Sequence, residues 1–141
     1  MDKQQRGIQV IRIWLGVTML IHGVMKVTSL EDTLAFFASI GLPSLFVYGV
    51  AAIELIGGLF MIIGFLIPLV SVGFIAVLVG AIFSFGLASG FSGYEYELFL
   101  AITSLAILVS YADKKYLTLK PVSYTHLYLL TFTDQWSIIN L

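Results

Sequence analysis

The most restrictive feature of this 141-residue sequence is a long stretch without charge. From Leu55 to Tyr94, about 40 residues pass without an acidic or basic side chain. As an α-helix this stretch would be roughly 60 Å long, which is twice the thickness of the hydrocarbon core of a bilayer. The stretch must therefore cross a membrane twice.

The composition agrees with a membrane protein and excludes several kinds of chemistry. Hydrophobic residues make up 60% of the chain and charged residues 11%, against about 45–50% and about 25% in soluble domains. The chain has no cysteine, so it cannot build an Fe–S cluster or a CxxC redox pair. Its two histidines, His22 and His126, are poorly suited to ligate a haem, and we expect no haem and no metal. The net charge of −1 excludes the basic surface of a nucleic-acid-binding protein.

Two further apolar stretches complete the predicted fold, which is all-α: an integral membrane four-helix bundle. Pro43 and Pro68 suit the first turns of two of its helices, because proline lacks an N–H that would be unpaired there. The fourth span is short for a bilayer crossing. The expected spans form one domain over residues 1–120 and cover about residues 8–27, 44–66, 68–88 and 96–112.

A short amphipathic helix is expected in the membrane interface between the first two spans. Residues 29–32, Ser-Leu-Glu-Asp, form a capping-box pattern, and Leu34 and Phe37 follow with helical spacing. Basic residues predict the orientation, because cytoplasmic loops are enriched in Lys and Arg. Both termini are therefore expected in the cytoplasm. The basic residues near them are Lys3, Arg6, Arg12, Lys114, Lys115 and Lys120.

The segment 121–141 differs in composition from the rest of the chain. Residues 122–127, Val-Ser-Tyr-Thr-His-Leu, resemble one reading frame of a transposase end sequence used to build sequencing libraries. The segment is therefore expected to be a translated adapter and not native. The alternative is an interfacial segment held by Tyr128, Phe132 and Trp136. In both cases His126 has no functional role.

The deepest charge in the predicted spans is Glu54. It lies about 10 residues, or roughly 15 Å, after Pro43, and shares a helix face with Gly57, Gly58 and Met61. A carboxylate there without a partner would cost several kcal/mol or take up a proton. Two interpretations stay open: an ion pair that fixes helix packing, or a polar site for the head group of a small redox-active or acidic molecule. Arg12, His22 and Lys26, on the neighbouring span, are the candidate partners.

The other polar residues of the spans differ in how strongly they indicate a site. Arg12 and Lys26 are long enough to reach the headgroups and could serve as anchors, whereas the short side chain of His22 needs a hydrogen-bond partner. Tyr94, Glu95, Tyr96 and Glu97 could simply anchor the outer start of the fourth span. The small residues at packing spacing are expected to let helices approach closely: Gly16, Gly23, Gly57, Gly73, Gly80 and Ser84.

Taken together, these residues resemble the pattern of the DoxX family of small four-helix bacterial membrane proteins. The resemblance covers about Arg6 to Asp113. Many members carry a proline where this chain has Glu97, and the end of the fourth span, Ser110-Tyr111-Ala112-Asp113, also departs from the pattern. The residues that carry the resemblance are Arg12, Gly16, His22-Gly23, Lys26, Gly41-Leu42-Pro43, Glu54, Gly57-Gly58, Gly64 and Gly93-Tyr94-Glu95-Tyr96.

The resemblance implies a multi-pass protein of the bacterial plasma membrane that serves an oxidoreductase system, with a quinone or quinol as its small molecule. Glu54 and His22 would then be the catalytic residues, Glu54 exchanging a proton with a quinone oxygen. The expected substrate-binding residues are Arg12, Lys26, Tyr94, Glu95 and Tyr96.

The expected partners follow from the same resemblance. Besides the bilayer, a soluble oxidoreductase subunit that contains cysteine is expected, and a homo-oligomer is left open. The alternative function is a non-catalytic membrane scaffold or a small transporter with a buried polar site centred on Glu54.

Overall fold

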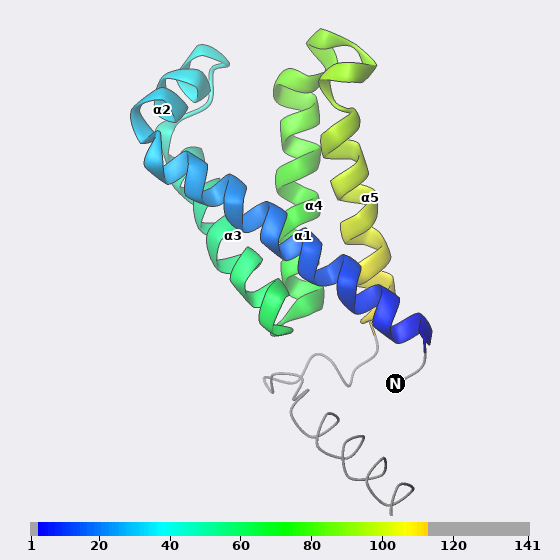
Figure 1. Ribbon diagram of the computed structural model, residues 1–141. Helices are drawn as coiled ribbons and strands as arrows, with labels where there is room; N and C mark the ends of the chain where they lie inside the picture. Colours follow the sequence, from blue (N-terminus) through cyan, green and yellow to red (C-terminus); the bar gives the residue numbers. More distant parts are fainter. Residues whose placement is uncertain (1–2, 113–141) are drawn as a thin grey trace, which may run out of the picture.

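The computed structural model describes residues 3–112, and every regular element in this part of the chain is helical (Figure 1). The expected adapter segment 121–141 and the three lysines that follow the fourth expected span lie outside the described residues. The elements are α1 (Lys3–Thr28), α2 (Leu30–Ser39), α3 (Ser44–Ile63), α4 (Ile67–Ala81), a π-helical turn η1 (Ile82–Gly86), two 3₁₀ turns, η2 (Leu87–Ser89) and η3 (Phe91–Gly93), and α5 (Glu95–Ser110).

Three of these helices are long and apolar enough to cross a membrane: α1, α3, and α4 continued by η1 and η2. The all-helical fold expected from the sequence is therefore confirmed for the described residues, and three of its helices fit the expected membrane spans. The fourth expected span corresponds to α5, which has 16 residues. At 1.5 Å per residue it is about 24 Å long, less than the roughly 30 Å of a bilayer core.

The outward surface of the helices is strongly apolar. Trp14 on α1 is 70% exposed and Phe99 on α5 is 67% exposed. Lipid chains can cover such side chains as well as a protein core can, so helices in a membrane associate through close packing rather than by hiding apolar surface. The exposed side chains are therefore the lipid-facing surface, and the stability of the bundle depends on how closely its helices fit.

The closest fit is between α1 and α3, whose backbones meet at glycines. A Cβ atom built on Gly16 would lie 2.9 Å from the carbonyl oxygen of Gly58, and one on Gly23 would lie 2.8 Å from the Leu55 nitrogen. The predicted stripe of α3, from Glu54 to Met61, is buried as expected. The packing role predicted for Gly16 and Gly23 is thus confirmed.

The helices α3 and α4 touch near one end of the bundle and separate toward the other (Figure 1). A Cβ on Gly57 would lie 2.8 Å from the ring of Phe74, which marks the contact. Gly80 lies farther along α4 and has no atom within 4 Å of its Cβ position. The packing role predicted for Gly80 was therefore wrong, because α3 has already diverged from α4 at this level.

The connection from α1 to α2 also differs from the expectation. The helix α2 begins at Leu30, as the sequence indicates. The Ser29 side chain, however, makes no capping hydrogen bond, so the predicted capping box does not form. Instead the Ser29 N–H donates to the Met25 carbonyl and the Ser29 carbonyl accepts from Thr33. Because these backbone bonds run across the junction, the N-terminus of α2 does not need the side-chain cap.

The arrangement gives a direct test of orientation. The start of α1 and the end of α5 lie at one end of the bundle, whereas α2 and the 3₁₀ turns lie at the other (Figure 1). The native chain has no cysteine, and Ser39, Ser92 and Ser110 are all exposed. In intact cells, single cysteines at Ser39 and Ser92 should react with a membrane-impermeant thiol reagent, and one at Ser110 should not. The reverse labelling pattern would contradict cytoplasmic termini.

Candidate functional site

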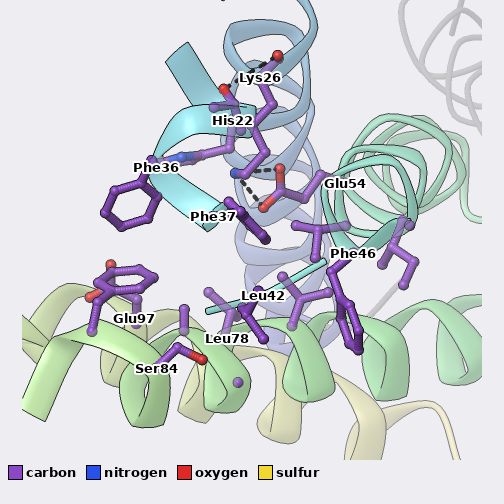
Figure 2. Close-up of a pocket in the computed structure, with 18 of the residues that line it drawn as sticks. His22, Lys26, Phe36, Phe37, Leu42, Phe46, Glu54, Leu78, Ser84 and Glu97 are labelled. Carbon is purple, nitrogen blue, oxygen red and sulfur yellow. Dashed lines mark hydrogen bonds and ion pairs between the residues drawn. The ribbon is translucent and has the colours of Figure 1, made fainter. Parts of the chain in front are cut away.

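A cavity of about 860 Å³ lies where α3 and α4 separate (Figure 2). Its walls come from α1, α2, α3, α4, η1 and α5. Most of the lining is apolar, and Figure 2 shows aromatic and aliphatic side chains such as Phe37, Leu42 and Phe46 around the open space. The polar groups that break this lining come from α1, the α1–α2 junction, α2, the middle of α3, η1 and the start of α5.

The first polar contact joins Lys26 on α1 to Glu54 on α3. The Lys26 Nζ lies 2.7 Å from Oε2 and 2.9 Å from Oε1 of Glu54. The Glu54 side chain is only 5% exposed and that of Lys26 22%. A carboxylate so deeply buried needs such a counter-charge. Of the three candidate partners, the structure therefore places Lys26 on Glu54, and Lys26 does not extend away to the headgroups.

The second polar contact lies one turn earlier on α1. The Nε2 of His22 is 3.2 Å from the hydroxyl oxygen of Tyr96 on α5, and the two ring centroids are 5.7 Å apart. The partner that His22 was expected to need is thus Tyr96. Since His22 and Lys26 are four residues apart, they share one face of α1. This face connects α3 and α5 through two neighbouring polar contacts, both of which line the cavity.

Arg12 lies outside the cavity. Its side chain is fully buried, and Nη1 donates a 2.6 Å hydrogen bond to the Met61 carbonyl in the last turn of α3. The expectation that Arg12 could extend to the headgroups was therefore wrong. The last carbonyls of a helix lack intrahelical donors and attract cations, which explains the position of this guanidinium. Arg12 is about 15 Å along α1 from His22 and is not among the residues that line the cavity.

Two more predicted substrate-binding residues, Tyr94 and Glu95, are also not among the described residues that line the cavity. The ring of Tyr94 packs against Phe91 with centroids 5.5 Å apart, and its Cβ faces Gly86. Glu95 is exposed at the start of α5. The structure brings together four of the seven predicted site residues: His22, Lys26, Glu54 and Tyr96.

The structure adds cavity residues that sequence reasoning missed. Glu97 lines the cavity next to Tyr96. Its spacing to the buried Leu100 and Ser104 places all three on one face of α5, and this signal could have identified it. Among residues 3–112, His, Asp and Glu side chains form no group of three or more that could hold a metal ion.

The outer wall of the cavity depends on the π-helical turn η1, which the sequence did not predict. The wider turn ends the regular part of α4, and Ser84 and Phe85 of this turn line the cavity. The rings of Phe85 and Phe36, which is on α2, make a T-shaped contact with centroids 5.4 Å apart. This contact connects α2 to the far wall. The packing role predicted for Ser84 was wrong, because its side chain borders the cavity instead.

Comparison with known proteins agrees with this architecture. A model of the DoxX family matches residues 7–87, which is more than half of the chain. The chain belongs to the DoxX family. The match includes His22, Lys26 and Glu54, whereas Tyr96 and Glu97 lie beyond it. This DoxX protein is also 37% identical over 116 residues to "Putative oxidoreductase CatD" of Bacillus subtilis (strain 168), which covers 82% of this chain and 85% of the relative. No solved structure matches the chain with significant similarity.

Proposed function

We propose that this DoxX protein is the membrane component of an oxidoreductase system and that its cavity binds a quinone or quinol. The observation that carries the proposal is an apolar cavity of about 860 Å³ with two polar contacts on one wall. Pockets for small ligands commonly measure about 300–1,000 Å³ and combine an apolar lining with a few placed polar groups. The name of the Bacillus relative, which includes the word oxidoreductase, supports the redox assignment.

A quinone ring has two oxygens that accept hydrogen bonds, and the polar wall offers donors for both. The ammonium of Lys26 has three donor hydrogens, and the hydroxyl of Tyr96 has one. These groups belong to contacts that lie about 6 Å apart along α1. We assign Lys26 and the His22–Tyr96 pair to the binding of the two ring oxygens, and Glu54 to the exchange of a proton with a ring oxygen, which it donates when the quinone is reduced and accepts in the reverse reaction.

The electrons must come from or go to another molecule. Reduction of a quinone to a quinol takes up two electrons and two protons. Oxidation of a dithiol to a disulfide releases the same number of each. Because this chain has no cysteine, we assign the dithiol to a soluble partner subunit.

We further propose that the protein lies in a bacterial plasma membrane, with α5 as the fourth span and both termini in the cytoplasm. The cavity is then in the outer half of the membrane, because α2 and the start of α3 contribute to its lining and lie at the end of the bundle opposite the start of α1 (Figure 1). The short length of α5 is compatible with a span if the local bilayer is thinned.

A binding titration with matched tyrosine variants tests the proposal. The purified protein in detergent is titrated with a quinone and binding is followed by calorimetry. Tyr96→Phe removes a hydroxyl from the cavity, and the loss of one hydrogen bond should weaken binding roughly 3- to 10-fold. Tyr48→Phe is the control, because Tyr48 is similarly exposed, at 52% against 47% for Tyr96, and is not among the cavity residues.

Two results would contradict the proposal. If the unaltered protein binds no quinone, the cavity serves another ligand or none, and the scaffold alternative gains support. If Tyr96→Phe and Tyr48→Phe bind quinone equally well, the polar wall does not hold the ring.

A further inference from the structure

Helix contacts bound the cavity at two ends, and exposed lining residues mark where it reaches the surface of the bundle. At its inner end α3 and α4 meet at Gly57 and Phe74. At the opposite end α2 covers it, where the rings of Phe36 and Phe85 meet. Between these ends, lining residues of α3 and α4 such as Leu45, Gly49 and Gly80 are exposed, so the cavity reaches the surface of the bundle there.

The rim of this side opening is suited to lipid rather than to water. Leu45 and Phe46, on the α3 side, both line the cavity and are 76% and 54% exposed. Large apolar side chains with this exposure on a membrane helix face the hydrocarbon. The opening between α3 and α4 therefore connects the cavity with the bilayer interior.

Two glycines keep the opening wide. Gly49 on α3 and Gly80 on α4 both line the cavity, and neither has any atom within 4 Å of its Cβ position. Unlike the glycines between α1 and α3, these two are not required by helix packing. Their small size leaves space on the two facing walls of the cavity.

The size of the cavity indicates a ligand larger than a quinone ring. At about 860 Å³ it lies near the upper end of the range for drug-sized ligands, about 300–1,000 Å³. A quinone ring alone, held at the polar wall, would leave most of this apolar volume empty. The lining residues on the α3 and α4 side are apolar and include Leu45, Phe46, Val77 and Ala81.

We infer that the ligand is a quinone with a long apolar side chain, which enters from the bilayer between α3 and α4. The ring lies at the polar wall of His22, Lys26, Glu54 and Tyr96, and the chain passes Gly49 and Gly80 into the lipid. This inference rests on the proposed function and adds the class of quinone and its route. A short, water-soluble quinone can instead enter at the α2 end, where the exposed polar residues Thr28, Ser29 and Asp32 line the cavity.

The experiment compares two quinones with the same ring, one carrying a ten-carbon chain and one carrying none. Each is titrated against the unaltered protein and against Gly49→Leu and Gly80→Leu, which narrow the opening. Gly7→Leu is the control, because Gly7 lies near the start of α1, outside the cavity lining, and also has no neighbour within 4 Å. For each quinone, the affinity of every variant is compared with that of the unaltered protein. Partitioning of the quinone into detergent is the same in all of these titrations, so it does not affect the comparison.

We expect Gly49→Leu and Gly80→Leu to weaken binding of the long-chain quinone about tenfold or more, and to change binding of the short one less than about twofold. Gly7→Leu should change neither. Thermal unfolding of each variant checks that it is folded. The inference is overturned if the two leucine variants affect both quinones alike, or neither. The proposed function fails separately, if the unaltered protein binds neither quinone.

Discussion

Glu54→Gln is expected to destabilise the protein and abolish quinone binding, and neutralising Lys26 as well should restore only the stability. Removing one member of a buried ion pair typically costs about 3–5 kcal/mol, because the other charge is left without a partner. We expect a loss near 3 kcal/mol in the free energy of unfolding, at the lower end of this range, since the Lys26 side chain is 22% exposed and is therefore not fully desolvated. The measurement is unfolding in mixed detergent micelles.

The double variant separates structure from function. Lys26→Met together with Glu54→Gln removes both charges, so most of the lost stability should return. Quinone binding should stay at least about tenfold weaker than in the unaltered protein, because the donor and the carboxylate are both absent. The control is Glu95→Gln, which neutralises an exposed carboxylate outside the cavity and should change stability by less than about 0.5 kcal/mol.

Two outcomes would oppose this assignment. If the double variant regains both stability and quinone binding, the ion pair only fixes the packing of α1 on α3. If Glu54→Gln is stable and binds quinone as tightly as the unaltered protein does, the cavity has no chemical centre at Glu54.

The sequence was sufficient to predict three long apolar helices and the need for a partner of Glu54, because both follow from the cost of charge in a bilayer. It could not select the partner. Arg12, His22 and Lys26 are all on the neighbouring helix, and only the tertiary structure shows that Arg12 is bonded to the Met61 carbonyl and His22 to Tyr96. Side chains of this length reach several positions, so helical spacing alone leaves the pairing open.

The cavity also could not be predicted from the sequence, because it depends on tertiary structure. Its existence depends on the angle between α3 and α4 and on the π-helical turn η1, neither of which has a local sequence signal. Gly80 illustrates the limit. Its spacing is the same as that of a packing glycine, but its Cβ position is open, because the helix that would have covered it has turned away.

Gly58→Ala is the second substitution with a large expected effect on stability, because α1 and α3 are in close contact at Gly58. A methyl group added there would lie 2.7 Å from the Leu20 nitrogen and 2.8 Å from the Gly16 carbonyl oxygen. Both are backbone atoms, so no side-chain rotation can relieve the clash and the two helices must separate. Overpacking of this kind typically costs about 1–3 kcal/mol, and for Gly58→Ala we expect the upper end of that range in the free energy of unfolding.

The matched control is Gly49→Ala, on the same helix. Nothing lies within 4 Å of that Cβ position, so the higher helix propensity of alanine should leave the stability unchanged or raise it by up to about 1 kcal/mol. Because α1 also carries His22 and Lys26, its displacement in Gly58→Ala should weaken quinone binding too. If Gly58→Ala unfolds with the same free energy as Gly49→Ala, the backbones of α1 and α3 are not in contact at Gly58. The polar wall would then not depend on the glycines that place α1 against α3.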